Sequence, residues 1–521
     1  MAGGRLVVVL LLCAVVAGCG AVPEPAPEPD PPAEAVIAEN SGVVKAATWR
    51  AVAARAAARE ARRQAAIRRA RASSTVAGAL RLARLTRRIT TATHARLVRE
   101  HALARSALGR LTGTRAAELG SVLATVDQLA AQHLLTHDRL EPVFLVLRRN
   151  REQWTRAPMP APGERRTFGR DPAVFQYYPG RGIQLQPLAS WGTVNWLAGT
   201  CLEGRCPVER LRRAVDRLAG LAARRGPFLA WEHYFAWGGG TAPWISGMTQ
   251  ATAVSALARA GRALHEPRWH RVAHRALGAF DAPPPLGVDG GDHFLMYSFA
   301  PSLRIFNGEL QAVSGLGELA RLGRDRVARR LFRRGERTTR RMVDAADTGA
   351  WSLYSWAGRE ATLGYHQLIA KFLGDMCERT AQRVYCTARR RFSRYEREPT
   401  RIGIAPLERL HARRATPVRF SISKMSTVRV RVFGRRGLAF SRDLQLAYGA
   451  HQVLWTPPGR GRFRLRILAR GPSGPVGVAK RRVEVRLPRP KPKRPKKDKK
   501  RERPITGEVL TGHTEPDRVS R

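Results

Sequence analysis

The spacing of apolar residues changes near residue 416, and this change constrains the fold more than any other feature of the sequence. Before that point apolar side chains recur three or four positions apart, as at Leu211, Val215 and Leu218, which is the period of an amphipathic helix. After it they alternate with arginines, as in the run from Val428 to Val432, which is the period of a half-exposed strand. The sequence therefore predicts a mainly α-helical chain followed by a separate β domain.

The helical part reads as a repeat of helix pairs. Its apolar stripes return every ~40–60 residues and are separated by loops rich in aromatic residues and glycine, a pattern that favours an α/α-toroid over residues 156–400. The alternating runs have glycine and proline turns between them. We therefore expect a small antiparallel β-sandwich, immunoglobulin-like in style, over residues 416–487.

Both ends of the chain carry segments that lie outside these domains. Residues 1–18 combine Arg5 with an apolar run too short to cross a bilayer, which is typical of a secretory signal peptide. The signal ends in Val16-Ala17-Gly18-Cys19, which resembles a bacterial lipobox and predicts lipidation of Cys19; the alternative is an ordinary signal with a chance cysteine. Residues 19–40 form a Pro-rich tether, and residues 488–521 a basic tail that we expect to be disordered.

The charge balance restricts the partners of the chain. Lys and Arg number 92 against 41 Asp and Glu, a formal net charge of +51, which suits an anionic cell-envelope glycan. Residues 41–155 form a basic region predicted to be helical, and its role as a membrane contact, a brace or a homodimer interface stays open. Because the signal predicts export and anchoring to the outer face of the bacterial cell membrane, we expect no nucleic-acid partner.

Four further cysteines follow the signal, at Cys201, Cys206, Cys377 and Cys386. They permit three disulfide connectivities, of which the two local loops are favoured in an exported protein. Zinc binding is disfavoured because the spacings are not C-x2-C. We expect no metal site.

Aromatic and polar residues gather in five loops of the helical part. Tryptophan and tyrosine in such loops are typical platforms for sugar rings, although a single aromatic side chain more often packs between helices. The five groups together favour a carbohydrate-binding cleft. They are residues 231–234, 244–250, 297–308, 347–354 and 365–366.

These loops also resemble the C-terminal domain of D-glucuronyl C5-epimerases. The resemblance rests on the order of short motifs over about residues 175–385, and is most specific between 297 and 370. The motifs are Tyr178-Pro179, Trp244-x-Ser246-x-Met248-x-Gln250, Phe306-Asn307-Gly308, Asp347-Thr348-Gly349, Tyr354 and Tyr365-His366. It implies an α/α-barrel-like domain and an isomerase that converts D-glucuronate to L-iduronate within a polysaccharide, as in heparan sulfate-like biosynthesis, without a cofactor.

The resemblance also implies roles for individual residues. Tyr354, Tyr365 and Tyr297 match family tyrosines that act at the sugar ring, and a tyrosine base needs neighbours such as Arg304 or Arg359 to lower its pKa. The expected substrate-binding residues are Arg304, Asn307, His366, Trp244, Gln250 and Tyr178.

The sequence departs from the family at three positions. Met296 stands where the family has a glutamate, Ala346 where it has a tyrosine, and Ile369 where many members have a histidine. The change at Met296 removes a candidate base, for which His293 or Glu232 are substitutes. Three functions remain open: a C5-epimerase, a non-catalytic polysaccharide-binding protein on the same fold, and a polysaccharide lyase that shares proton abstraction at C5.

Overall fold

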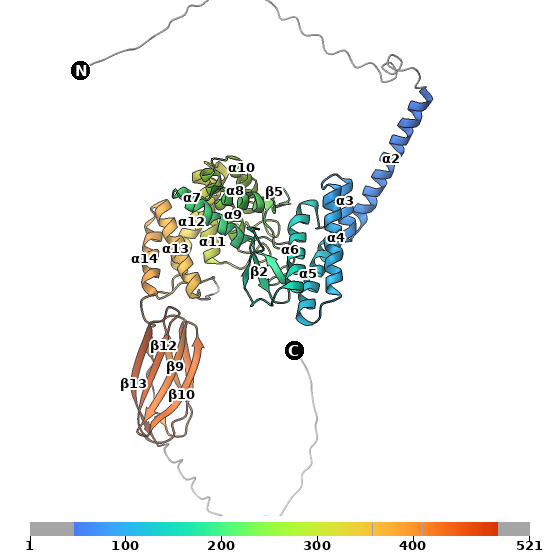
Figure 1. The fold of residues 1–521 in the computed structure, drawn as a ribbon. Coiled ribbons are helices and arrows are strands. Elements are labelled where there is room, and N and C mark those ends of the chain that lie inside the picture. The colour runs from blue at the N-terminus through green and yellow to red at the C-terminus, as the bar shows by residue number, and fades with distance from the viewer. Residues whose placement is uncertain (1–45, 357, 408–409, 488–521) are drawn as a thin grey trace, which may run out of the picture. The chain divides into compact units, whose positions relative to one another are not determined.

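The computed structural model describes residues 46–356, 358–407 and 410–487, with side chains from residue 52 onward (Figure 1). Cys19, the predicted signal, the tether and the basic tail lie outside the described residues. The chain divides into two compact units, which are described separately below. The first holds residues up to 187 together with 216–224 and 232–243, and the second holds the remainder.

The first unit begins with a run of helices, as the basic, alanine-rich sequence predicts. Their bounds are α2 (Ala46–Ala72), α3 (Val76–Leu85), α4 (Thr91–Leu108), α5 (Gly113–Ala131) and α6 (His137–Arg156). Thr75 and Thr90 cap α3 and α4, because each hydroxyl accepts a hydrogen bond from the backbone N–H three residues on, at 3.1 Å. Within the described residues, no helix combines the length and the apolar character that a bilayer crossing requires.

A three-stranded sheet follows α6 where the sequence predicted loops or short strands. It consists of β1 (Arg165–Arg166), β2 (Phe175–Tyr178) and β3 (Gly182–Leu185) in that order. The buried carboxylate of Glu118 on α5 holds the turn between β2 and β3, since it accepts hydrogen bonds from the Tyr177 hydroxyl (2.8 Å) and the Gly182 N–H (2.7 Å). Gly182 has φ +73°, and a Cβ there would lie 2.4 Å from the Asn150 side chain, so only glycine fits.

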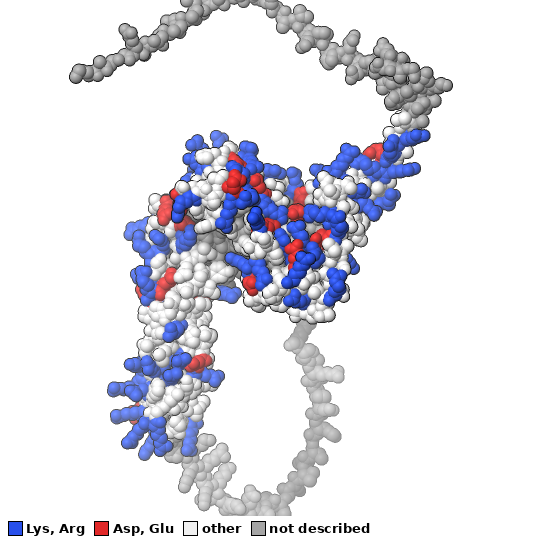
Figure 2. Space-filling view, viewed as in Figure 1, with Lys and Arg blue, Asp and Glu red and all other residues white. Residues whose placement is uncertain are grey.

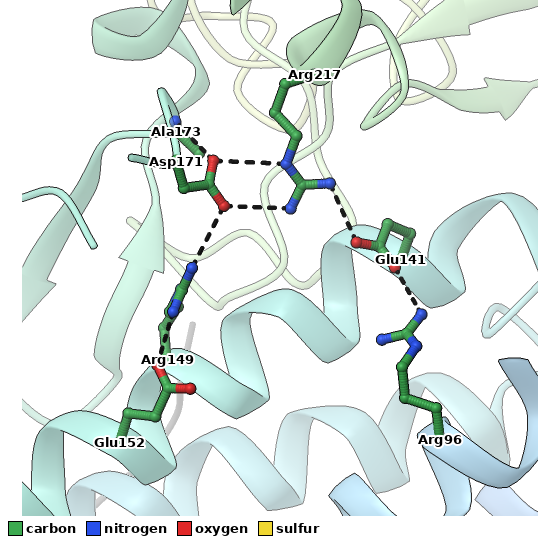
Figure 3. Close-up of polar contacts among 7 residues, drawn as sticks. All are labelled: Arg96, Glu141, Arg149, Glu152, Asp171, Ala173 and Arg217. Atoms are coloured by element: carbon green, nitrogen blue, oxygen red, sulfur yellow. Dashed lines mark hydrogen bonds and ion pairs between the residues drawn. The ribbon is translucent and has the colours of Figure 1, made fainter. Parts of the chain in front are cut away.

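Ion pairs tie the helices of the first unit to its loops (Figure 3). Arg217, near the end of α8 (Val208–Ala219), donates to Asp171 (3.3 Å) and to Glu141 on α6 (3.1 Å). Arg149 donates to the same Asp171 at 3.4 Å. Burial acts to raise the pKa of Asp171, but the Ala173 N–H and the two arginines outweigh it and hold that pKa below its usual value.

The second unit contains the helical part that the aromatic loops interrupt. It comprises α7 (Pro187–Leu202), α9 (Gly247–Ala263), α10 (Arg268–Ala276), η1 (Leu277–Phe280), α11 (Phe306–Leu322), α12 (Arg326–Ala345), α13 (Leu363–Thr380) and α14 (Arg383–Tyr395). The short strands β4 (Ala223–Arg225) and β5 (Phe228–Ala230) precede α9. Helix α11 packs against α9, α12 and α13, so it forms the centre of this part.

Ion pairs and disulfides link the elements of this unit. Glu318 on α11 forms ion pairs with Arg259 on α9 (2.9 Å) and with Arg379 on α13 (2.8 Å). Disulfides join Cys201, near the end of α7, to Cys206, just before α8, and Cys377 on α13 to Cys386 on α14. These are the two local loops that the sequence favours.

The C-terminal region is the β domain that period-two alternation predicts. Its strands are β6 (Ile402–Ile404), β7 (Leu410–His411), β8 (Thr416–Ile422), β9 (Ser426–Gly434), β10 (Gly437–Leu446), β11 (Gly449–Trp455), β12 (Gly461–Arg470) and β13 (Val476–Arg486). They form a five-stranded sheet, β10-β9-β12-β13-β7, and a three-stranded sheet, β11-β8-β6. Val430, Ile467, Phe420 and Trp455 belong to one core that draws on both sheets.

Three details of this domain were not predicted from the sequence. The sheet is mixed rather than wholly antiparallel, because β7 pairs in parallel with β13. A bulge interrupts the pairing of β10 with β9 between Leu438 and Phe440. The domain also begins earlier than residue 416, at β6.

Candidate active site

Three tyrosines expected at the sugar ring come together in the second unit. Tyr354 lies on a loop that pairs with the chain just before α11, since the Phe306 N–H donates to the Tyr354 carbonyl (3.0 Å). Tyr365 lies in the first turn of α13, and its ring centroid is 4.9 Å from that of Tyr354. Tyr297 stacks on Phe299 at 5.3 Å, close enough to Tyr354 to affect its titration.

The surroundings of Tyr354 keep its hydroxyl protonated. Burial is the largest cause that raises its pKa, followed by the charges that Tyr297 and Tyr365 would carry. The charge of Arg359 acts to lower this pKa, as expected of a nearby arginine, but burial outweighs it. A hydrogen bond with Tyr365 acts in the same direction as burial and also raises the pKa of Tyr354.

Met296 stands in place of the family glutamate and packs over the start of α11. A Cβ at Gly308 would lie 3.1 Å from the Met296 sulfur, so glycine leaves the room that the thioether needs. The Ser246 hydroxyl lies 3.9 Å from the same sulfur. The position is therefore occupied by a soft apolar group that neither donates nor accepts a proton.

The first turn of α11 and the loop before it hold unsatisfied polar atoms. Asn307 is fully buried, and neither atom of its side-chain amide has a hydrogen-bond partner among the described residues. The Nε2 atom of His293 is also buried without a described partner, whereas its Nδ1 lies 2.8 Å from Asp292. Buried polar atoms are nearly always hydrogen-bonded, so these two side chains have capacity for a water molecule or a ligand.

The two substitutes for the missing glutamate differ in availability. Glu232, in the first unit, is buried and forms a bidentate ion pair with Arg139, at 2.6 and 2.9 Å. Its carboxylate also accepts from the Tyr234 hydroxyl at 3.2 Å. Glu232 is thus committed to structural contacts, and His293 is the substitute that retains an open nitrogen.

Two of the predicted binding residues are part of the core. His366 is fully buried and stacks on Trp351, with ring centroids 3.7 Å apart. Its Nδ1 lies 2.7 Å from the Ser352 hydroxyl and its Nε2 lies 3.0 Å from the Phe392 carbonyl, so the ring offers no nitrogen to a ligand. Gln250 is also fully buried, and its amide makes two hydrogen bonds to the backbone of Trp231, at 3.1 and 2.9 Å.

The other predicted binding residues lie in different surroundings. Trp244 is buried and packs edge-on against Tyr297, 5.7 Å away, so it supports the tyrosine cluster. Arg304 has a side chain that is 41% exposed, with one nitrogen 3.3 Å from Asp292, and stays accessible to an anion. Tyr178 belongs to the first unit, where its hydroxyl accepts from Gln186 at 2.9 Å and its ring packs on Phe235.

Glu309 is a residue that sequence reasoning missed. It is fully buried on α11, where its carboxyl accepts from the Phe294 N–H (2.6 Å) and contacts the Thr339 hydroxyl (3.3 Å). Burial raises its pKa to about 8 against the effect of these hydrogen bonds. A lone acid beside the apolar stripe of a helix was the only available signal. Within the described residues, no three His, Cys, Asp or Glu side chains gather as metal ligands.

Comparisons with known proteins bear on the same segment. No curated protein matches the chain. A solved structure that matches is cellobiose 2-epimerase from Spirochaeta thermophila DSM 6192, which is 16% identical, covers 54% of this chain and 72% of that chain, and has a TM-score of 0.34; at this score the likeness carries no weight. Residues 226–394 match the family described as D-glucuronyl C5-epimerase C-terminus. The resemblance is thus confirmed for these residues, which are similar to the C-terminal part of the D-glucuronyl C5-epimerases.

Proposed function

We propose that this protein is a C5-epimerase that acts on glucuronate residues of a polysaccharide. The observation that carries the proposal is the cluster of Tyr297, Tyr354 and Tyr365, which lies within the segment that matches the epimerase family. Such a cluster supplies hydroxyl groups on which protons can be taken up and returned. The finer architecture that suits this function is an α/α-toroid, which we propose for the helices around α11.

The proton transfers follow from the chemistry at C5. The C5 proton lies α to a carboxylate, so a base removes it on one face of the ring and an acid returns a proton on the other. Tyr354 is assigned as the acid, because its raised pKa keeps its proton available at neutral pH. Tyr365 is hydrogen-bonded to Tyr354, so the two hydroxyls lie on the same face of the ring, where the 41% exposed Tyr365 passes a proton from water to Tyr354. His293, whose Nε2 has no described partner, is assigned as the base on the other face. After each turnover Tyr354 regains a proton from water through Tyr365, and His293 loses the abstracted proton to water.

The substrate carboxylate needs a cation, because the intermediate places additional charge on it. Arg359 is exposed and lies near Tyr354, whose pKa its charge acts to lower. Arg304 is partly exposed, and its backbone carbonyl accepts from the Trp356 N–H (3.1 Å) beside the same loop. We assign these two arginines to the carboxylate. We leave His366 and Gln250 out of the site because their polar atoms are occupied.

The sequence supplies the proposed setting of this reaction. The lipobox-like Val16-Ala17-Gly18-Cys19 supports an anchor on the outer face of the bacterial membrane, where an anionic envelope glycan would be the substrate. The test of this part is metabolic labelling with a fatty acid, which should mark the wild-type protein and fail to mark a Cys19→Ser variant.

Hydrogen exchange at C5 tests the reaction directly. The purified protein is incubated with a linear polymer of D-glucuronate and N-acetylglucosamine in heavy water, and NMR reports deuterium at C5 and iduronate signals. We expect both to appear with the wild-type protein. Tyr354→Phe and Tyr365→Phe should lower the rate of exchange at least 100-fold, since proton transfer by a positioned group contributes about 10²–10⁴-fold.

Tyr395→Phe is the matched control. Tyr395 is a buried tyrosine whose hydroxyl contacts Asp347 at 3.2 Å, and it should retain near wild-type exchange. If unsaturated chain ends appear together with C5 exchange, the activity is that of a lyase and not of an epimerase. Binding of the polymer without any exchange would replace it with a polysaccharide-binding protein, a result that the loss of a carboxylate at Met296 would explain.

A further inference from the structure

The outer face of the five-stranded sheet carries like charges directly opposite one another. The register places Arg466 beside Arg431 on one side and beside Lys480 on the other. One step along the strands, Arg464 lies beside Arg482. Like charges in opposite positions of neighbouring strands destabilise a sheet, so an arrangement of this kind points to a function rather than to stability.

These five residues are here called the basic rows, and none of them has an acidic partner among the described residues. The acids on the neighbouring rows are engaged elsewhere, since Asp443 pairs with Arg429 (3.2 Å) and Glu484 lies 4.0 Å from Arg486. Among the described residues no ion pair involves the basic rows, and the Nε atom of Arg431 is buried without a hydrogen-bond partner. Figure 2 shows basic side chains crowded over the β domain with few acidic ones among them.

The basic rows border a hollow that has an aromatic wall. The hollow has a volume of about 540 Å³ and is lined by Arg464, Arg466, Lys480 and Arg482, with Phe433 at its side. Phe433 is half-buried and occupies the position beside Arg464 on the neighbouring strand. An apolar ring face beside unpaired cations suits a ligand that is both a ring and an anion, because the ring packs on the phenyl group while guanidinium groups hold the acid.

We propose that the basic rows hold an acidic polysaccharide at a site separate from the tyrosine cluster. The choice of a uronate polymer rests on the proposed function, because the same chain carries the segment similar to D-glucuronyl C5-epimerases. A hollow also suits a chain of sugar rings better than a flat layer of lipid headgroups. The rows tether the long polymer, and tethering raises the local concentration of further substrate units at the active site.

Three arginines of the rows provide the test variant. Arg464, Arg466 and Arg482 are exposed, so R464Q/R466Q/R482Q removes like-charge repulsion and should fold as well as the wild type. The control variant, R414Q/R419Q/R442Q, removes the same charge from exposed positions of the same domain outside the rows. Binding to the polymer of D-glucuronate and N-acetylglucosamine is measured by titration calorimetry at several salt concentrations, with full-length protein.

The row variant should bind the polymer at least 10-fold more weakly and show a smaller dependence of affinity on salt, because fewer counterions are released. The control variant should stay within about 2-fold of the wild type. Equal losses in the two variants would reduce the effect to net charge and overturn the proposal. The proposal would also be overturned if the row variant lost binding only to a single-stranded oligonucleotide or to phosphatidylglycerol vesicles and not to the polymer.

A second measurement separates this proposal from the proposed function. On a short glucuronate oligosaccharide the row variant should keep the wild-type rate of C5 exchange, whereas on the long polymer its KM should rise and its kcat stay unchanged. If the wild type binds the polymer through the basic rows but shows no C5 exchange, the epimerase proposal is refuted and the polysaccharide-binding role of the rows remains. If C5 exchange on the polymer is the same in the row variant and the wild type, the binding role of the basic rows is refuted and the epimerase proposal remains.

Discussion

Replacing the buried acid of α11, Glu309→Gln, should remove a large pH dependence of stability. The Glu309 carboxyl accepts from the Phe294 N–H and contacts the Thr339 hydroxyl. A glutamine keeps the first contact through its oxygen and meets the hydroxyl through its amide. The substitution therefore removes the ionisation of the side chain while it preserves its shape and its partners.

The magnitude follows from the pKa of Glu309, which burial raises from 4.5 to about 8. Because the folded state binds this proton more tightly than the unfolded state, the contribution is fully present below pH 4.5 and is lost as the pH rises through 8. The difference of about 3.5 in pKa, at about 1.36 kcal/mol for each unit, corresponds to about 5 kcal/mol when the loss is complete. The same relation gives about 1 kcal/mol at pH 5 and about 4 kcal/mol at pH 8.

Urea denaturation followed by tryptophan fluorescence, repeated between pH 5 and pH 8, measures this effect. The variant should gain about 3 kcal/mol in free energy of unfolding relative to the wild type over that interval. Glu378→Gln on the exposed side of α13 is the control for the loss of one negative charge and should show no such change. A difference between Glu309→Gln and the wild type that stays constant with pH would refute the argument that Glu309 is buried as a neutral acid.

Three further substitutions test other buried groups. His233→Gln should make the protein more resistant to acid denaturation. Burial lowers the His233 pKa to about 3, so the wild type loses up to about 5 kcal/mol of its free energy of unfolding as the pH falls from 6.5 to 3. Glu318→Gln should lower the free energy of unfolding by about 3 kcal/mol at pH 7, because Arg379 and Arg259 outweigh burial and lower the Glu318 pKa to about 2. In the wild type, thermal melts should show the same loss of stability only as the pH falls from 4.5 to 2. His366→Phe should lower stability by about 2–4 kcal/mol, since it abandons two buried hydrogen bonds, and polymer affinity from calorimetry should not change if the ring is structural.

Local patterns in the sequence were sufficient where the structure depends on neighbours in the chain. The alternation at Val428, Val430 and Val432 predicted a strand with one buried face, and all three side chains are buried. The short spacing of the cysteine pairs favoured the two disulfides that the structure contains. The two-residue strand β7 is too short to show a period, and for this reason its parallel pairing with β13 was not predictable.

The site was predictable only in part, because long-range packing decides whether a polar side chain faces a ligand or the core. The motif order led to Tyr354 and Tyr365, whose rings are in contact. It could not show that His366 meets the carbonyl of Phe392, which is 26 residues further along the chain. Nor could it show that burial would outweigh Arg359 and raise the pKa of Tyr354. The family match covers 226–394, but the hydrogen bonds in the structure distinguish side chains with open polar atoms from those whose polar atoms are occupied in the core.

The bulge in β10 bears on how molecules of this protein meet one another. β10 is an outer strand of the five-stranded sheet, and Leu438 near its start is 55% exposed. A long, regular edge of this kind would offer its backbone groups to a strand of a second molecule. The register shift between Leu438 and Phe440 breaks that regularity, and Arg442 and Asp443 place charges along the rest of the strand. Concentrated solutions of the protein should therefore resist aggregation through this edge.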